Sequence, residues 1–341
     1  MSTDTKQPGT TDTGQSGATA PSAAGRSGRT AQVWRTAGPV AVTALMIVVV
    51  LVSNPRFFSG GGPGILAIQA TFILLAALGQ SCVLNIGSID LSNAALAVLA
   101  AMILAMTLGS MGPLALVVAI GLSTVIGMVN GFVIAYAQVP SFALTLGTLG
   151  ILQAASLVIS KATTVYVKGS SDVLTPLFGS AMAGLPTAFW LSVVLAVALW
   201  FVTKRTRFGQ SMTAVGINET GAIFSGLSNR RVKILAFGIS GFFSGVAGVM
   251  IIAQGGAASS FGLGSDLLLP GIAAAIVGGT AITGGVTNPL LVVFGALTIA
   301  LIPIAAAVLG VPASAQSLVY GLVIIVAAAL TMQRRSSRTV K

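Results

Sequence analysis

Two aspartates stand out because each is alone in a long uncharged stretch. Asp90 is the only charged residue in 57–160, and Asp266 is the only one in 234–333. A carboxylate at the centre of a bilayer costs at least about 2.5 kcal/mol, so such a residue can mark an ion or substrate path. Each aspartate also lies within two residues of a serine at the start of an apolar run, where an anion can cap a helix. We favour the cap for both and keep Asp90 as a pathway candidate.

The residue types exclude most enzyme chemistry. The 341 residues include no histidine and a single cysteine, Cys82, so neither histidine acid–base catalysis nor a cysteine-ligated metal site is expected. We do not expect the aspartates to couple transport to protons, because neither has a histidine or a second carboxylate as a relay partner. The phosphate-binding motif Gly-x-x-x-x-Gly-Lys-Ser/Thr is absent from the sequence, so this chain is not expected to bind ATP by that device. We predict a chain without catalytic residues, metal or cofactor.

The composition places these residues in lipid. Hydrophobic residues make up 55% of the chain and charged residues 7%, far from a soluble domain. A bilayer core of about 30 Å needs about 20 apolar residues per helix. We therefore predict an all-α polytopic membrane protein, and ten segments qualify as spans: 37–53, 64–84, 91–108, 113–135, 141–160, 188–203, 233–253, 267–284, 289–309 and 314–332.

The basic residues predict the orientation of these spans. Cytoplasmic loops retain Lys and Arg, and 14 of the 17 basic residues fall inside if both termini are cytoplasmic. Eight or ten spans satisfy this rule, and we favour ten. The net charge of +11 lies in short clusters at span ends, which favours membrane topology and lipid contact over nucleic acid. The chain then divides into a disordered cytoplasmic tail (1–36), a transmembrane domain (37–332) and a basic cytoplasmic tail (333–341).

Two pairs of similar motifs suggest an internal repeat. Gly87–Leu91 and Gly264–Leu267 each open an apolar run, and Val139–Ser141 is echoed by Val311–Ser314. The third and fifth spans would match the eighth and tenth, and an odd separation inverts the repeats across the membrane, as in many transporters. Glycines recurring at 127, 131 and 238–248 predict close helix packing. The pairs Gly278-Gly279 and Gly284-Gly285 predict that the eighth span is interrupted.

The cytoplasmic loop 204–233 is predicted to contain a short amphipathic helix. Asn218 can cap it and Glu219 lies in its first turn, while Gly226 can end it. Ala222, Ile223 and Leu227 give this helix an apolar side. That side needs either a protein partner or the lipid headgroups, and the residues alone do not rank the two.

Several motifs now point to one family. They are Gly79-Gln80, Ile86–Ser92, Asn130-Gly131, Val139–Thr148, the loop from Thr206 to Gly226, and Gly278–Thr280 with Gly284-Gly285. In this order they resemble the membrane permeases of ribose-type sugar ABC importers, of the branched-chain amino acid/ribose permease superfamily, over about residues 60–332. Ser88 and Pro270 depart from the usual pattern, which leaves the transporter interpretation intact and the exact sugar open.

The resemblance implies a function and a set of partners. It implies an inverted-repeat type II ABC importer permease in a bacterial cytoplasmic membrane, paired with a second copy or a paralogue. An ATPase subunit would carry ATP and Mg²⁺, and an extracytoplasmic binding protein would deliver a monosaccharide such as ribose or xylose. The helix from Asn218 to Gly226 would be the coupling helix seated in the ATPase. The implied coupling residues are Gly216, Asn218, Glu219, Ala222 and Gly226.

A sugar path needs hydroxyl partners rather than charges. Besides Asp90, the candidates for the pathway are Asn85, Thr145, Thr148, Gln153, Thr280 and Thr283. For each of them a helix–helix hydrogen bond is an equal alternative. Three other functions stay open: an ABC permease for a nucleoside, polyol, sugar-like signal or branched-chain amino acid, an ion-coupled secondary transporter, or a channel.

Overall fold

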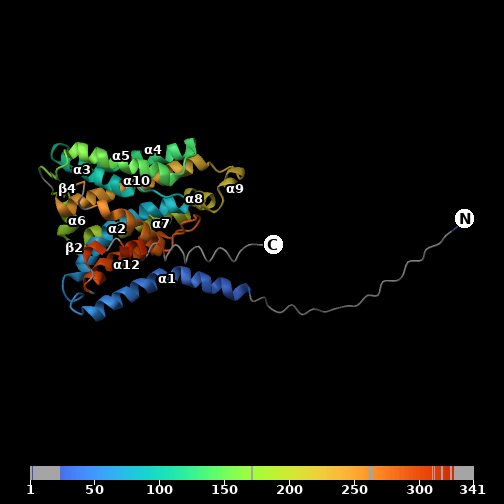
Figure 1. Cartoon of the computed structure of the whole chain (residues 1–341), viewed down its shortest axis with the longest axis horizontal. Coiled ribbons are helices and arrows are strands. Elements are labelled where there is room, and N and C mark those ends of the chain that lie inside the picture. Colours follow the sequence, from blue (N-terminus) through green and yellow to red (C-terminus); the bar gives the residue numbers. More distant parts are fainter. Residues whose placement is uncertain are drawn as a thin grey trace.

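The protein is a bundle of long apolar helices. The computed structural model describes residues 24–169, 172–260 and 264–308, together with Ser2, Gly310, 312–315, 318–322 and Ile325. The long helices are α1 (Ala24–Ser53), α2 (Gly62–Asn85), α3 (Asn93–Met111), α4 (Leu114–Ala137), α5 (Ser141–Ser160), α7 (Thr187–Arg205), α10 (Asn229–Gly255) and α12 (Pro289–Val308). They lie side by side, with α4 and α5 along one edge and α1 along the other (Figure 1).

The all-α polytopic prediction is confirmed, but the count of ten spans is not. Among the described residues, seven helices are long and apolar enough to cross a membrane: α2, α3, α4, α5, α7, α10 and α12. The apolar part of α1, Ala37–Ser53, is shorter. The expected tenth span, 314–332, and the basic tail 333–341 lie largely or wholly outside the described residues.

Helix α1 begins within the segment that was predicted to be a tail. The tail was expected to extend to residue 36, yet α1 begins at Ala24. Its first residues, Ala24–Thr36, are mostly polar, but they include Ala, Arg and Gln, which are good helix formers. The helix therefore extends from the apolar segment toward the N-terminus in spite of the polar composition. The rest of the predicted tail, apart from Ser2, lies outside the described residues.

The eighth predicted span is interrupted, as its glycines indicated. Helix α11 (Leu268–Val277) follows the 3₁₀ turn η1 (Ser265–Leu267) and has ten residues. Gly279, Gly284 and Gly285 then adopt left-handed φ angles of 87°, 83° and 76°, which L-residues with a side chain rarely adopt. Residues 278–288 thus form an irregular segment between α11 and α12.

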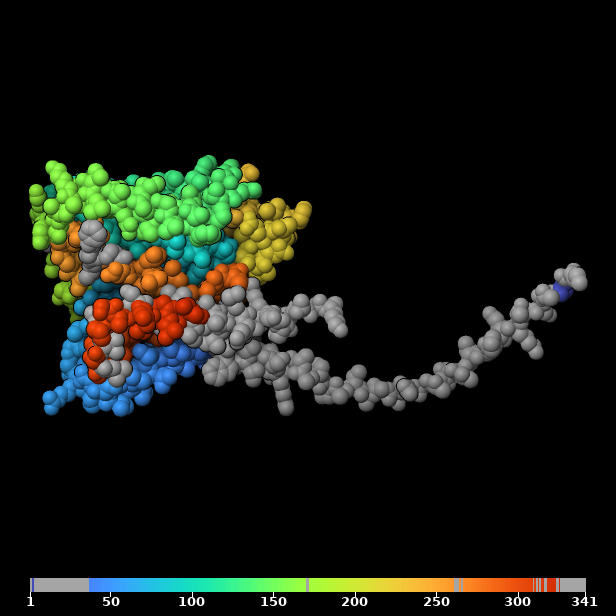
Figure 2. Space-filling model, in the orientation of Figure 1, coloured from blue at the N-terminus to red at the C-terminus, as the bar shows by residue number. Residues whose placement is uncertain are grey.

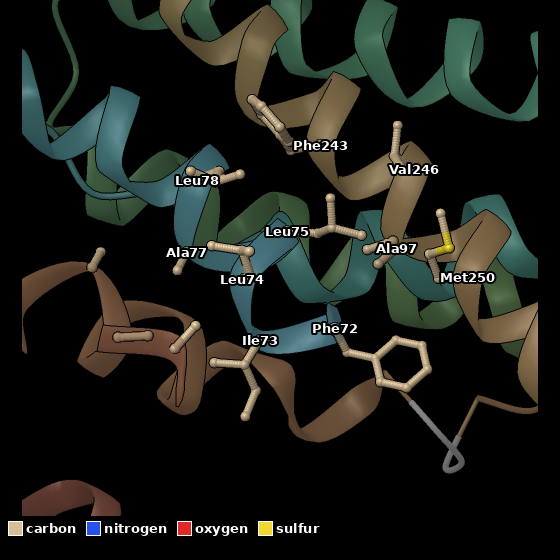
Figure 3. Close-up of a cluster of buried hydrophobic side chains, with 14 of the residues drawn as sticks. Phe72, Ile73, Leu74, Leu75, Ala77, Leu78, Ala97, Phe243, Val246 and Met250 are labelled. Carbon is tan, nitrogen blue, oxygen red and sulfur yellow. The ribbon is translucent and has the colours of Figure 1, made fainter. Parts of the chain in front are cut away.

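Helices α2 and α10 form the centre of the bundle. Side chains of α2 pack on both sides of that helix, in one apolar cluster with Ala97 of α3 and with Phe243, Val246 and Met250 of α10 (Figure 3). A helix that is apolar all round suits this position. By contrast, most of α5 lies at the surface of the chain.

Glycines allow α4 and α10 to approach closely. A Cβ on Gly241 would lie 2.2 Å from the carbonyl oxygen of Ser123, and one on Gly127 would lie 2.4 Å from that of Phe237. The predicted role of these glycines in helix packing is confirmed, since any larger side chain would force the two backbones apart.

Short elements cover the two ends of the bundle. At one end lie α6 (Thr175–Gly179) and four two-residue strands, in which β1 (Val165–Tyr166) pairs antiparallel with β4 (Ala257–Ala258), and β2 (Ala181–Met182) with β3 (Leu185–Pro186). Helices α8 (Arg207–Ile217) and α9 (Glu219–Phe224) lie at the opposite end (Figure 1). A second 3₁₀ turn, η2, covers Ala313–Ala315.

The inverted repeat is not confirmed. Gly87 and Gly264, which open the two echoed motifs, both have left-handed φ angles, of 72° and 108°. The helices that follow differ, because α3 has 19 residues and α11 has ten. Asp90 is fully buried whereas Asp266 is exposed, so two aspartates that look alike in sequence have different surroundings.

Candidate translocation and coupling sites

Asp90 is held by hydroxyls and a backbone amide in the connection between α2 and α3. Its Oδ1 accepts hydrogen bonds from the backbone N of Ser92 (2.9 Å) and from Ser92 Oγ (2.6 Å). Its Oδ2 accepts one from Ser240 Oγ of α10 (2.8 Å). Ser92, not Asp90, is the N-cap residue of α3. Asp90 is thus not the N-cap residue itself, but its carboxylate accepts a backbone N–H at the start of α3, as the cap prediction required, and it also ties this turn to α10.

The network around Asp90 extends into α4 and α5. Asn130 donates from Nδ2 to Ser92 Oγ (3.1 Å), and Thr148 donates from Oγ1 to Asn130 Oδ1 (2.8 Å). On the other side, Asn93 donates from Nδ2 to Ser240 Oγ (3.1 Å). Four helices thus meet through uncharged side chains at one buried carboxylate. The hydroxyls of Ser92 and Ser240 each donate one hydrogen bond and accept another, so both hydroxyls are fully used in the network.

The first turn of α5 supports the same connection. Ser141 Oγ accepts from the backbone N of Ile89 (3.1 Å), and Thr145 Oγ1 accepts from that of Leu91 (3.0 Å). Irregular backbone at membrane depth is tolerated when protein groups satisfy it. Thr145 is fully buried, so in this conformation the structural alternative describes it better than the pathway.

The structure separates the predicted pathway residues into groups. Asp90, Thr145 and Thr148 lie in the network described above. Thr280 bonds Thr287 across the irregular segment, Oγ1 to Oγ1 at 3.0 Å, and Thr283 of that segment is exposed. Gln153 is exposed on α5, beyond Thr148 on the same helix. The predicted site omitted four residues, Ser92, Asn93, Ser141 and Ser240, although Ser92 and Ser141 fall within the motifs Ile86–Ser92 and Val139–Thr148.

Asn85 lies where α8 meets the bundle. Its backbone oxygen accepts a hydrogen bond from the N of Gly285 (2.8 Å), so the end of α2 is joined to the irregular segment. A Cβ on Gly216 of α8 would lie 1.9 Å from that same oxygen, and a Cβ on Gly284 would lie 2.8 Å from the N of Gly87. We call Asn85, Gly87, Gly216, Gly284 and Gly285 the glycine junction. It puts α8 in direct backbone contact with the end of α2 and with the irregular segment after α11, which in turn lies against Gly87.

Helix α9 has the predicted ends. Asn218 is its N-cap, with Oδ1 accepting from the N of Gly221 (3.0 Å), and Gly226 has a left-handed φ of 80° just beyond its end. Glu219 in the first turn forms an ion pair with Lys233 of α10 (2.8 Å). The short helix is thereby fixed to the start of α10.

The apolar side of α9 differs from the prediction. Ala222 is 5% exposed and packs inward, whereas Ile223 is 51% exposed and Phe224 is 87% exposed. Phe224 was not among the predicted contact residues. Helix α8 was not predicted either, although its cap was readable: Thr206 Oγ1 accepts from the N of Gly209 (3.2 Å). Figure 2 shows this region, in yellow, projecting at one end of the molecule.

Comparison with known families decides the class. The family described as branched-chain amino acid transport system / permease component matches residues 63–328. The chain belongs to this family. The match covers every helix from α2 to α12, so the permease family inferred from the motifs is confirmed.

Two of three relatives compared with the permease are named for sugars, and the third is named for autoinducer 2. The permease is 31% identical over 302 residues to the D-allose transport system permease protein of Escherichia coli, covering 87% of this chain and 91% of that protein. It is 31% identical over 291 residues to the ribose import permease protein of Haemophilus influenzae, covering 83% and 90%. It is 28% identical over 291 residues to the autoinducer 2 import system permease protein of Escherichia coli, covering 83% and 84%. Such proteins are the non-catalytic, multi-pass subunits of ABC importers.

Proposed function

We propose that this permease imports a monosaccharide, such as ribose or xylose, as the membrane subunit of an ATP-driven ABC importer. The names of its relatives support the substrate class. A separate subunit binds ATP and Mg²⁺ and hydrolyses the ATP, an external protein delivers the sugar, and a second permease copy or paralogue completes the pair. Both termini face the cytoplasm, and this chain needs no cofactor of its own.

The observation that carries this proposal is the glycine junction. Helix α8 ends at Ile217, α9 begins two residues later, and Gly216 lies against the backbone of Asn85 and Gly285. A rigid contact without intervening side chains transmits displacement with little slack, because closely packed groups are not compressible. Movement of α8 and α9 would then shift both irregular connections together.

Helix α9 provides the contact with the ATPase in this proposal. Ile223 and Phe224 form an exposed apolar projection, and a buried aromatic residue commonly anchors an interface. The other coupling residues act indirectly: Asn218 and Gly226 set the ends of α9, Glu219 ties it to α10, and Ala222 packs it inward. ATP binding would draw the α9 helices of the two permeases together and rock the bundles between inward-facing and outward-facing states.

The test is recovery of the ATPase with the permease. Phe224→Asp should lose the co-purified ATPase and ATP-driven sugar uptake, because the charge would replace the buried anchor of the interface. Tyr166→Asp is the matched control, an exposed aromatic at the opposite end of the bundle, and it should keep the ATPase bound. Normal recovery of the ATPase with Phe224→Asp would remove α9 as the docking helix.

A second cargo class follows from one relative. The likeness to an autoinducer 2 import permease favours a sugar-like signalling molecule as the alternative substrate. Uptake by the reconstituted importer, measured with D-ribose, D-allose and autoinducer 2 in parallel, separates the two. If this chain alone took up solute in liposomes along an ion gradient and without ATP, the protein would be a secondary transporter, and both ABC importer proposals would be wrong.

A further inference from the structure

A small cavity lies between α3, α5 and the start of α11. Its volume is about 80 Å³, enough for on the order of five water molecules. Its walls are formed by Ala94, Ala95, Val98, Leu149, Gln153, Ser156, Ser260 and Leu268. Among the described residues of this lining, three are polar and none is ionisable, so the cavity suits an uncharged ligand with hydrogen-bonding groups.

Ser156 is the unusual member of this lining. It is 1% exposed, and its Oγ has no hydrogen-bond partner within the described part of the chain. Five other buried serines in the long helices instead donate to a carbonyl three or four residues earlier: Ser81, Ser123, Ser160, Ser192 and Ser244. A buried hydroxyl without a partner costs about 1–3 kcal/mol, so a ligand or water must satisfy it.

Ser260 repeats the pattern from the facing wall. Its Oγ is buried and has no hydrogen-bond partner among the described residues. Gln153 lies one turn before Ser156 on α5 and is exposed, which places a primary amide at the edge of the same cavity. Two hydroxyls and an amide can each donate and accept, which matches the hydroxyl groups of a sugar.

The cavity lies beside the Asp90 network. Helix α5 carries both Thr148, which bonds Asn130, and the cavity residues Leu149, Gln153 and Ser156. Its opposite wall begins at Ala94, two residues beyond Ser92. Ser260 lies in the connection between α10 and α11, two residues beyond β4, and Leu268 is the first residue of α11. The cavity therefore adjoins the connection between α10 and α11 on one side and the Asp90 network on the other.

We propose that this cavity is a transient binding site for an uncharged polyhydroxylated solute, held by the hydroxyls of Ser156 and Ser260 and by the amide of Gln153. The inference rests on the proposed function and deepens it, because it gives the sugar a stopping point inside this chain. The apolar walls contribute little affinity for a sugar, so binding is weak and the solute leaves readily, as transport requires.

The experiment is protection of an introduced thiol. The full-length Ser156→Cys permease, assembled with its ATPase in lipid nanodiscs, is treated with iodoacetamide, a small uncharged reagent, with and without D-ribose or D-allose. Native Cys82 is fully buried and contributes a low background. Ser160→Cys is the matched control, one turn along α5 and outside the cavity lining. We expect sugar to slow alkylation of Ser156→Cys at least threefold, and L-leucine to have no effect.

Three results would overturn the site. They are equal alkylation of Ser156→Cys with and without sugar, no alkylation at all, or equal protection of Ser160→Cys. Ser260→Cys repeats the test from the facing wall should Ser156→Cys fail to fold. The wild-type importer is assayed in parallel for ATP-driven uptake. Sugar uptake without protection overturns this cavity and leaves the proposed function standing, whereas protection without ATP-driven uptake supports the cavity and overturns the ATP-driven function.

Discussion

At the scale of single residues, buried polar groups in this permease chiefly organise backbone. Asp90 accepts three hydrogen bonds, two of them from Ser92 and one from Ser240. Thr145 and Ser141 satisfy amides of the same connection. In a bilayer every backbone group needs an internal partner, so an irregular turn at this depth demands such side chains. The lone charge in a long apolar stretch thus has a structural role in this conformation.

Substitution at Asp90 tests that role. Asp90→Asn should retain uptake within a few-fold of wild type, because its amide can accept from Ser92 and donate to Ser240. Asp90→Leu should lower the stability by several kcal/mol, since each orphaned buried partner costs about 1–3 kcal/mol. Thermal unfolding of the purified permease and ATP-driven uptake are the measurements. Complete loss of uptake by Asp90→Asn at wild-type stability would make the negative charge itself a requirement of transport.

At the scale of elements, the contact between α8 and the irregular connections distinguishes this permease from a simple helix bundle. Gly216 of α8 lies against the end of α2 and the segment after α11, and Ile217 of α8 also adjoins Gly285. Its neighbour α9 is fixed by the Glu219–Lys233 ion pair to α10. Docking and transmission therefore depend on different helices, and they can be separated by substitution.

Gly216→Ala should uncouple transport from ATP hydrolysis. The added Cβ would lie 1.9 Å from the oxygen of Asn85, so α8 must move away from the junction. Overpacking of this kind costs about 1–3 kcal/mol, and we expect uptake to fall about tenfold or more. The ATPase should still co-purify, because Phe224 is unchanged. Uptake and ATP hydrolysis in proteoliposomes are the measurements.

Gly121→Ala is the control for this substitution. Gly121 is a helical glycine on α4 with no atom within 4 Å of the added Cβ, so uptake should stay at the wild-type rate. Wild-type coupling in Gly216→Ala would show that the junction transmits no movement.

At the scale of the whole molecule, the charges separate along the bundle. Lys204 and Arg205 end α7, Arg207 opens α8, and Arg230, Arg231 and Lys233 open α10. Lys168 lies at the other end, where its carbonyl oxygen adjoins Gly109 near the end of α3. The segregation of basic residues that predicted the orientation is thus present in space.

Labelling in intact cells tests the orientation. Lys168→Cys should react with a membrane-impermeant maleimide from outside, because residue 168 is exposed and follows the extracytoplasmic end of α5 in this orientation. Lys204→Cys, exposed at the end of α7, should react only after permeabilisation, because it would face the cytoplasm. The opposite pattern would invert the molecule and move α9 to the outer face, away from any ATPase.

The sequence alone determined the features that depend on neighbouring residues. Hydropathy located the long helices, Gly112-Pro113 and Pro140 marked breaks at which α3, α4 and α5 begin or end, and Asn218 identified the start of α9. These signals are local, because spans, turns and caps are stabilised within a few residues. The motifs that identified the family are local signals too, because each consists of neighbouring residues and only their order along the chain had to be read.

Which of these elements are in contact, and through which face, depends on the packing of the whole bundle. Asp90 and Ser240 are 150 residues apart in the chain, and nothing in either local sequence pairs them. The inward position of Ala222, the exposure of Phe224, the junction at Gly216 and the unpaired hydroxyl of Ser156 likewise depend on how helices are rotated and packed. A helix that is apolar on all sides carries no periodic signal for its rotation, so its partners are set by close packing across the bundle.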